Sequence, residues 1–283
     1  MSDGTIGIVI PVFNTMGSFL DECVASAIDQ TIPVSVVVVD DGSMNSETLR
    51  SLDAWERRGI RVLRHETNRG VSTALNTGIE AQSTEFIAPV GSDDRLRPSY
   101  CARVRDALAD DPSVGIVSVN LLQFGARELI SRPASEVRAE DLLFANLIPG
   151  ASAFRRSDWL NLGGFTATAS FGEDWDFWLR VLRSGRRAIG LNETLYEYRQ
   201  HPAQSIVTTI GDSRLAQQLN VVRRNRALWE ENIVTVMEAY WRLKDQADEQ
   251  EARLSVLDRR YGRVNRILGR LAALTTRSPN RQG

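Results

Sequence analysis

The feature of this sequence that most limits its fold is an alternation of short apolar runs with segments of helical periodicity over residues 6–120. The apolar runs are short and rich in β-branched residues, so they predict strands that are buried on both faces. We expect strands at residues 6–10, 34–39, 60–64, 85–90 and 114–119, and helices at 19–28, 46–57, 71–81 and 98–109. Repeated β-α-β units of this size need right-handed crossovers, which predicts an α/β domain whose mostly parallel sheet is flanked by helices.

The order of elements is less regular from residue 121 to about residue 198. Helices are expected there at 157–162 and 173–184, with short strands near 152–155 and 195–198. The first domain is therefore predicted to span residues 1–211.

A seven-residue apolar pattern dominates the rest of the chain. Alternating steps of three and four residues from Leu219 to Leu271 meet an apolar or aromatic residue at all but two positions, Arg226 and Gln250. A 3.5-residue period of this length predicts a left-handed coiled coil about 80 Å long, which makes the chain a homo-oligomer. We assign residues 212–275 to this segment and 276–283 to a disordered basic tail. The alternative is one or two helices that fold back onto the first domain.

Charge is distributed unevenly along the chain. Seven arginines and no acidic residue follow Asp258, whereas the preceding part holds 27 basic and 36 acidic residues. An acidic body is unsuited to non-specific nucleic-acid binding, and a basic end suits an anionic membrane surface or an acidic partner.

The two cysteines, Cys23 and Cys101, are far apart and have no histidine nearby, so they are interpreted as core residues in a reducing compartment. No apolar run approaches the ~18 residues of a membrane span, and Met1–Thr5 lacks the character of a signal peptide. These observations predict a cytoplasmic protein, with peripheral contact at the inner membrane face as a further expectation.

Three acidic pairs are the main candidates for a functional site. Asp40-Asp41 and Asp93-Asp94 each follow a predicted strand, and Glu173-Asp174 begins a predicted helix. Ligands of open α/β sheets bind beyond the carboxyl ends of the strands, and clustered carboxylates repel one another unless a cation neutralises them. The simplest interpretation is a divalent metal, Mn²⁺ or Mg²⁺, that carries a phosphorylated ligand. Helix capping and solvated turns are the alternative for each pair taken alone.

Other residues suit a nucleotide ligand or a proton transfer. Phe13 follows the first strand and can stack on a base, although such a segment is more often a simple turn. Asp41 can accept hydrogen bonds from a base or a ribose. Asp174 lies beside a glycine-rich stretch at a helix start and is a candidate general base. His201 is a weaker candidate, and His65 is interpreted as structural.

Taken together, these segments resemble the family 2 glycosyltransferases, whose catalytic domain has the GT-A fold. The resemblance covers residues 5–205, and its motifs occur in the family's order at residues 8–14, 38–43, 68–72, 76–78, 92–94, 163–165, 173–174 and 198–201. It implies transfer of a sugar from a nucleotide-diphosphate donor with inversion at the anomeric carbon. The acceptor is expected to be a cell-surface glycan or a lipid-linked molecule.

The resemblance also implies a role for individual residues. Asp174 is the expected base, and the metal is expected at Asp93, Asp94 and His201. The residues expected to bind the donor are Pro11, Phe13, Asn14, Asp41, Asn68, Gly70 and Asp93. Those expected on the acceptor side are Gly164, Glu173 and Trp175.

Two residues depart from the family's pattern. Gly91 stands where many members have an acidic residue, and Leu75 stands where many have an arginine, for which Arg69 is a candidate replacement. These departures favour an alternative function, a non-catalytic scaffold with a glycosyltransferase-like body. A nucleotidyltransferase is disfavoured because Pro11–Gly17, where a phosphate-binding loop is expected, contains no basic residue.

Overall fold

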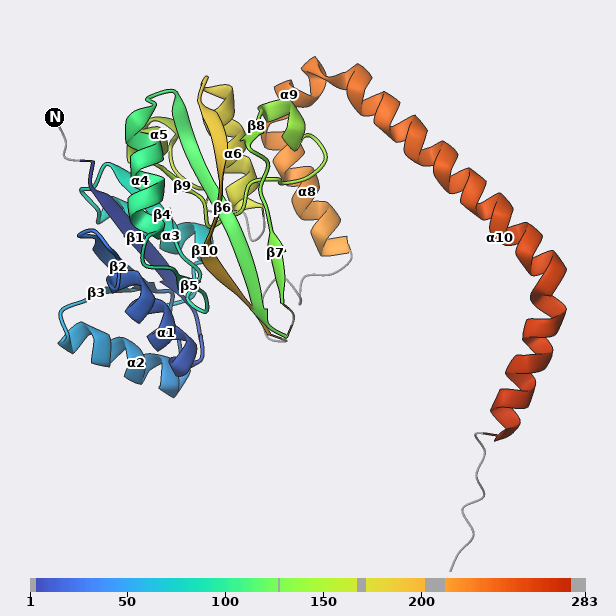
Figure 1. Cartoon of the computed structure of the whole chain (residues 1–283), viewed down its shortest axis with the longest axis horizontal. Helices are drawn as coiled ribbons and strands as arrows, with labels where there is room; N and C mark the ends of the chain where they lie inside the picture. Colours follow the sequence, from blue (N-terminus) through green and yellow to red (C-terminus); the bar gives the residue numbers. More distant parts are fainter. Residues whose placement is uncertain (1–3, 127, 167–171, 202–211, 276–283) are drawn as a thin grey trace, which may run out of the picture. The chain divides into compact units, whose positions relative to one another are not determined.

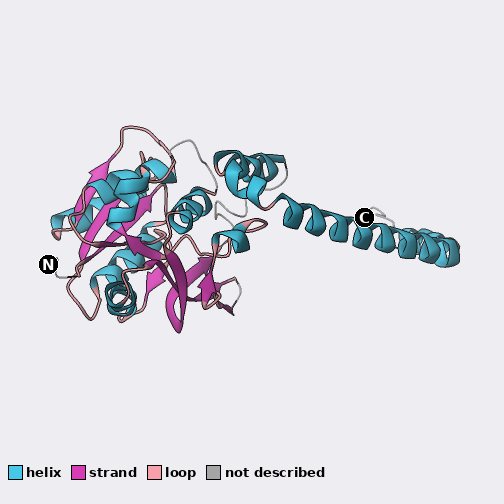
Figure 2. Ribbon diagram, turned by 90° about the horizontal axis from the view of Figure 1, so that it is seen from above, coloured by secondary structure: helices cyan, strands magenta, loops and turns pink. Residues whose placement is uncertain are grey.

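The computed structural model describes residues 4–126, 128–166, 172–201 and 212–275. It divides into two compact units, Met1–Leu228 and Trp229–Gly283. The first unit holds the sheet and the helices that cover both of its faces (Figures 1 and 2).

The strands of the first unit form a single ten-stranded sheet in the described part of the chain. Their bounds are β1 Ile6–Val12, β2 Ser35–Asp40, β3 Arg61–Arg64, β4 Phe86–Pro89, β5 Arg95–Leu96, β6 Val114–Gly125, β7 Leu129–Ser131, β8 Glu136–Val137, β9 Ala153–Arg155 and β10 Arg187–Gln200. The order is β3-β2-β1-β4-β9-β6-β10-β5, with β7 paired to β6 and β8 paired to β10.

The sheet is mixed: its longest pairings are parallel, as expected, but several short strands pair antiparallel. The pairs β2–β3, β1–β2, β1–β4 and β6–β10 are parallel, whereas β9 is antiparallel to both β4 and β6. Because β9 runs opposite to both of its neighbours, β4 and β6 point the same way. The carboxyl ends of the long strands therefore meet at one edge of the sheet, where ligands of such folds bind.

The helices agree with the expected segments to within a few residues. They are α1 Gly17–Ile28, α2 Ser46–Arg57, α3 Val71–Glu80, α4 Tyr100–Asp110, α5 Arg156–Leu162 and α6 Glu173–Arg183, with a short 3₁₀ helix, η1, at Ala139–Leu142. Asn45 caps α2 by accepting hydrogen bonds from the backbone N–H groups of Glu47 and Thr48. Helix α1 begins two residues earlier than expected, so Ser18 lies inside it.

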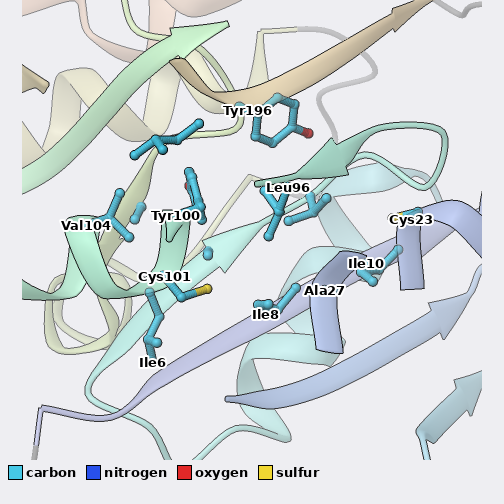
Figure 3. Packing of buried hydrophobic residues seen from close by; sticks show 14 of the residues in the cluster. Ile6, Ile8, Ile10, Cys23, Ala27, Leu96, Tyr100, Cys101, Val104 and Tyr196 are labelled. Carbon is cyan, nitrogen blue, oxygen red and sulfur yellow. The ribbon is translucent and has the colours of Figure 1, made fainter. Parts of the chain in front are cut away.

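The main core lies on the face of the sheet that α1, α2 and α4 cover. Ile6, Ile8 and Ile10 alternate along β1 and pack against side chains of α1 and α4 such as Cys23 and Val104 (Figure 3). On the other face α3 approaches the sheet closely. A Cβ at Gly78 would lie 2.3 Å from Cγ1 of Val9, so only glycine fits at that point of α3.

The predicted domain boundary at residue 211 falls before two helices, α8 Asp212–Arg224 and α9 Arg226–Glu231. Contacts within the chain place residues 212–228 in the first unit. Asn225 Nδ2 donates to Asp176 Oδ1 of α6 at 2.9 Å, and Val221 and Leu228 are buried. This segment is therefore part of the α/β body.

The long helical segment is also not continuous. Breaks at Asn225 and Asn232 separate α8, α9 and α10, the last of which spans Ile233–Thr275. Among the side chains described in α8 and α9, Val221 and Leu228 are buried, whereas the predicted seam residue Leu219 is 41% exposed. The first turns of the predicted seam therefore pack through another face of the helix than the one the seven-residue pattern predicted. The coiled coil stays a prediction for α10. None of the helices in the described part of the chain is long and apolar enough to span a bilayer.

Candidate active site

One cavity of about 480 Å³ brings together acidic residues that lie far apart in the sequence. Asp93 and Asp94 reach it from the segment after β4, and Glu173 and Asp174 reach it from the start of α6. The rest of the lining consists of Pro11, Val71, Leu75, Pro89, Val90, Gly91, Leu121, Gln123, Pro149, Gly150, Ala151, Phe165, Tyr196 and Tyr198. Two of the three acidic pairs singled out in the sequence thus share one cavity, and the third pair, Asp40-Asp41, is not in its lining.

Asp94 is held by the protein on both of its carboxylate oxygens. Oδ2 accepts a hydrogen bond from the Tyr196 hydroxyl at 2.7 Å, and Oδ1 accepts one from the backbone N–H of Arg199 at 2.8 Å. Burial, together with the charge of Asp93, raises the pKa of Asp94 to about 8. Asp94 therefore ties β10 to the end of β4, and its predicted role as a metal ligand stays a prediction.

The departure at Gly91 has a structural explanation. A Cβ at Gly91 would lie 2.5 Å from Oδ2 of Asp94, so Asp94 occupies the space that a side chain at position 91 would need. The backbone N–H of Gly91 also donates to the Tyr196 hydroxyl at 3.1 Å. In this chain the carboxylate of Asp94 therefore occupies the space beside Asp93 that an acidic side chain at position 91 would need.

Asp93 and His201, which the sequence assigned to the same metal, lie side by side. Asp93 Oδ2 is 2.8 Å from His201 Nε2, and both side chains are partly exposed. The imidazole packs against the ring of Phe19 with 5.4 Å between centroids. Arg199 lies over the same ring and donates its Nε–H to the carbonyl oxygen of Asp93 at 2.7 Å.

This pair fits a divalent cation as a partial ligand set. A carboxylate and an imidazole are both ligands of Mn²⁺, and cations of this kind complete their coordination with phosphate and water oxygens. Over the residues that the structure describes, no group of three or more His, Cys, Asp or Glu side chains forms a closed metal site. A cation at Asp93 and His201 would thus need oxygen atoms from its ligand.

The expected base, Asp174, lies in the first turn of α6. Its Oδ1 accepts a hydrogen bond from the backbone N–H of Trp175 at 2.7 Å, and its Oδ2 accepts one from Asn146 Nδ2 at 2.9 Å. Burial raises the pKa of Asp174 to about 6. Burial and the adjacent charge of Asp174 raise the pKa of Glu173 to about 7. A carboxylate whose pKa lies near neutrality is suited to general base catalysis.

Asn146 is a site residue that sequence reasoning missed. It lies between η1 and β9, in a segment without periodicity, and no motif pointed to it. The backbone N–H of Ile148 donates to Asn146 Oδ1 at 3.2 Å, so the amide Nδ2 is turned toward Asp174. The indole of Trp175 donates to the Leu142 carbonyl at 3.0 Å and anchors this segment to α6. Trp175 is buried in this contact and does not line the cavity, contrary to its expected place on the acceptor side.

Gly164 supports the cavity without lining it, which also differs from its expected place on the acceptor side. Its φ of 74° favours glycine, and a Cβ would lie 2.8 Å from Asn76 Oδ1. Asn76 holds both backbone groups of Phe165: its Oδ1 accepts from the N–H at 2.9 Å, and its Nδ2 donates to the carbonyl at 2.7 Å. The close approach at Gly164 thus lets Asn76 fix Phe165 in the cavity wall.

Asp41, expected to contact the base of the donor, is buried within the protein. Its oxygens accept hydrogen bonds from the backbone N–H groups of Arg69 and Gly70 at 2.9 and 2.7 Å, and Oδ1 lies 2.7 Å from His65 Nδ1. The other ring nitrogen of His65 is 3.0 Å from the Thr77 hydroxyl. Asp41 and Gly70 therefore shape the loop before α3, and His65 has the structural role that the sequence suggested.

The remaining residues that were expected to bind the donor are of two kinds: some hold the protein's own backbone, and others are accessible to a ligand. Asn14 has a left-handed backbone with φ of 52°, and its Oδ1 accepts from the N–H groups of Met44 and Asn45 at 2.8 and 2.9 Å. Asn68 is exposed and accepts from the N–H of Gly70 at 3.0 Å. Phe13 is 46% exposed, as a ring that stacks on a ligand would be, and Pro11 lines the cavity.

A mixed sheet flanked by helices, with acidic pairs gathered at its ligand-binding edge, defines the class of the glycosyltransferases with a GT-A-like α/β fold. The sequence profile of the family described as "Glycosyl transferase family 2" matches residues 7–171, more than half of the chain. The chain belongs to this family.

Individual relatives are distant. The chain is 27% identical to the uncharacterized glycosyltransferase EpsJ of Bacillus subtilis (strain 168) over 70% of its own length and 61% of that protein. It is 27% identical to an Escherichia coli UDP-Gal:alpha-D-GlcNAc-diphosphoundecaprenol beta-1,3-galactosyltransferase, over 64% of this chain and 68% of the relative. A crystal structure of S. aureus TarS 1–349 with UDP superposes with a TM-score of 0.59 at 20% identity, over 70% of this chain and 61% of that one. The last comparison supports the fold.

Proposed function

We propose that this chain is an inverting, metal-dependent glycosyltransferase that moves a sugar from a nucleotide-diphosphate donor to a hydroxyl group of a glycan or lipid-linked acceptor. The observation that carries the proposal is the shared cavity, which has Asp93 and Asp174 in its lining. The UDP bound to TarS and the lipid-linked substrate named for the Escherichia coli relative are consistent with these substrate classes.

The geometry suits an in-line displacement at the anomeric carbon. The acceptor hydroxyl must lose a proton as it attacks, and the diphosphate must leave from the opposite face of the sugar. Asp174 can accept that proton, because its pKa of about 6 leaves it mostly ionised at neutral pH while Asn146 and the N–H of Trp175 hold its oxygens in place. Asp93 and His201 would hold the cation, which stabilises negative charge on the leaving diphosphate.

A screen of nucleotide sugars by thermal unfolding tests the proposal. With Mn²⁺ present, the matching donor at a hundred times its Kd is expected to stabilise the protein by about 2.7 kcal/mol. Asp93→Asn should remove the part of this stabilisation that depends on Mn²⁺, because it removes the carboxylate of the proposed metal site. If no nucleotide diphosphate or nucleotide sugar raises the unfolding temperature, the proposal fails.

We further propose that the enzyme is a homo-oligomer through α10, with the seam beginning at Ile233 and not at Leu219. The seam residues Tyr240, Leu243 and Leu254 are 54%, 65% and 66% exposed in the single chain, which leaves an apolar stripe that a second copy would cover. The arginine-rich residues 259–281 would bring such an oligomer to an anionic membrane surface.

Sedimentation of two matched variants tests the oligomer. Leu254 lies on the seam and Val256 lies off it, and both are exposed in the single chain at 66% and 56%. Leu254→Lys is expected to shift the protein toward the monomer, whereas Val256→Lys should leave the oligomer intact. A wild-type chain that sediments as a monomer at every concentration would refute this assembly.

A further inference from the structure

Two residues of the segment between η1 and β9, Asn146 and Gly150, approach the carboxylate of Asp174. The tryptophan indole that donates to the last residue of η1 anchors one end of this segment. At the other end, the buried hydroxyl of Ser152 donates to the carbonyl oxygen of Pro149 at 2.7 Å. The segment is therefore held in place on both sides of the residues that face Asp174.

Asn146 fixes one of the two oxygens of Asp174. Its Nδ2 donates to Oδ2 of Asp174 at 2.9 Å, while its own Oδ1 accepts a hydrogen bond from the backbone N–H of Ile148 at 3.2 Å. Because the backbone occupies the amide oxygen, the amide nitrogen is the end that faces the carboxylate. A carboxylate oxygen has two lone pairs, so Oδ2 can accept a second hydrogen.

Gly150 leaves the space beside that oxygen open. A Cβ at position 150 would lie 3.0 Å from Oδ2 of Asp174, which is closer than ordinary van der Waals contact. Gly150 is exposed, and it lines the cavity together with Asp174. Its φ is not in the left-handed region, so the backbone conformation does not require glycine. The missing side chain therefore matters for the access to Oδ2 that it gives.

We propose that the acceptor hydroxyl reaches Oδ2 of Asp174 past Gly150, and that Asn146 is the positioning residue that holds this oxygen toward the opening. This inference rests on the proposed function, because it concerns the approach of the acceptor. The hydroxyl proton passes to Oδ2 while the acceptor oxygen bonds to the anomeric carbon. The bond from that carbon to the diphosphate breaks, and its electron pair leaves with the diphosphate.

An assay with a small and a large acceptor tests the inference. The donors are UDP-glucose, UDP-galactose, UDP-N-acetylglucosamine and GDP-mannose with Mn²⁺ present, and the acceptor probes are the octyl glycosides of the same sugars. Hydrolysis of each donor is measured in parallel, since water is the smallest acceptor. A wild type that neither transfers nor hydrolyses any of these donors contradicts the proposed function, and this inference with it.

Gly150→Ala tests the route of the acceptor. The added methyl group is expected to lower kcat/KM for the octyl glycoside by about tenfold, while donor hydrolysis changes by less than about threefold because water needs less space. The matched control is Ala145→Ser, which adds one atom to an exposed side chain of the same segment outside the cavity lining and should change neither rate. Unchanged transfer in Gly150→Ala, or an equal loss of transfer and hydrolysis, overturns the proposed route and leaves the proposed function intact.

Asn146→Ala tests the positioning role. A hydrogen bond donated to a carboxylate favours its charged form, so the loss of this bond raises the pKa of Asp174. We expect kcat to fall by about tenfold with the KM for the octyl glycoside within about threefold of wild type, and the acid limb of the pH profile to move up by about one pH unit. The other titratable groups of the cavity lining, which this variant leaves in place, are Asp93, Asp94, Glu173, Tyr196 and Tyr198.

The matched control for Asn146→Ala is Asn192→Ala. Asn192 accepts a hydrogen bond from Asn120 Nδ2 at 3.1 Å, and neither residue lines the cavity. The control variant loses one side-chain hydrogen bond and should keep the wild-type kcat and acid limb. If Asn146→Ala lowers the unfolding temperature but leaves the acid limb where it is in the wild type, Asn146 is only structural and its positioning role is overturned.

Discussion

Replacing Asp174 by asparagine is expected to lower the rate of sugar transfer by about 10²–10⁴-fold while the affinity for the donor stays within a few-fold of wild type. An amide cannot accept the proton of the acceptor hydroxyl, whereas the proposed donor and metal residues Asp93 and His201 are untouched. Steady-state transfer and calorimetric donor binding measure the two quantities separately. Equal turnover of wild type and variant would favour the alternative of a non-catalytic scaffold.

The same group predicts how activity depends on pH. Burial raises the pKa of Asp174 to about 6, and only the deprotonated carboxylate acts as a base. Transfer by the wild type is therefore expected to fall as the pH decreases through the range in which Asp174 and its neighbour Glu173 take up protons. The residual activity of Asp174→Asn should lack this acid limb.

A control for folding follows from the contact with Asn146. In Asp174→Asn an amide nitrogen must face either the Asn146 Nδ2 or the N–H of Trp175, both of which are donors. The double variant Asn146→Asp with Asp174→Asn restores a donor–acceptor pair, since the carboxylate introduced by Asn146→Asp would also accept from the N–H of Ile148. The double variant should recover the stability that Asp174→Asn loses. It should not recover activity, because its carboxylate lies at position 146 and no longer at the start of α6.

The largest effect on stability is expected at Asp176, which no motif identified. It is almost fully buried, and its oxygens accept hydrogen bonds from the Thr166 hydroxyl, the Arg180 guanidinium and Asn225 Nδ2 at 2.7, 3.1 and 2.9 Å. Asp176→Ala leaves the partly buried Arg180 guanidinium and the buried Asn225 amide without this acceptor, and it should lower the free energy of unfolding by about 3–5 kcal/mol. Urea denaturation monitored by tryptophan fluorescence measures the change.

The matched control is Asp248→Ala on α10. Asp248 pairs with Lys244 at 2.8 Å, but its side chain is 61% exposed, so its loss should change the free energy of unfolding by less than about 1 kcal/mol. If Asp176→Ala changes the free energy of unfolding as little as Asp248→Ala does, the buried hydrogen bonds of Asp176 contribute little to stability. A chain ending at residue 211 would lose Val221, Asn225 and Leu228 and should resemble Asp176→Ala, whereas a chain ending at Glu231 should not.

The sequence predicted the parts of the fold that depend on local pattern. The strands β1, β2, β3, β4 and β6 were found from apolar runs, and the acidic pairs at 93–94 and 173–174 were correctly expected to share a cleft. The strand near 152–155 was expected, but its antiparallel direction was not, because a run of three residues carries no signal for the direction in which a strand pairs. Its antiparallel insertion between β4 and β6 depends on tertiary pairing.

Other errors came from patterns that suit two structures equally. In α8 and α9 both faces carry apolar residues, Leu219 and Trp229 on the predicted seam and Val221 and Leu228 on the buried face. Periodicity alone cannot tell which of two apolar helix faces is buried when the faces are offset by only one or two residues. Asp41 was expected to bind a ligand, but it binds groups of the protein itself. Its partners, Arg69, Gly70 and His65, could not be foreseen because only the folded chain brings them to it.

The overlap between position 91 and Asp94 has a consequence for anyone who redesigns this protein or compares it with its relatives. Residues 91 and 94 compete for one volume, since a Cβ at Gly91 would lie 2.5 Å from Asp94 Oδ2. Substituting an acidic residue at 91 alone would displace Asp94 from Tyr196 and Arg199 and so disturb β10 well before it added a ligand. An acidic residue can therefore be introduced at position 91 only if Asp94 is replaced at the same time. The absence of an acidic residue at position 91 is not by itself a sign of lost catalysis.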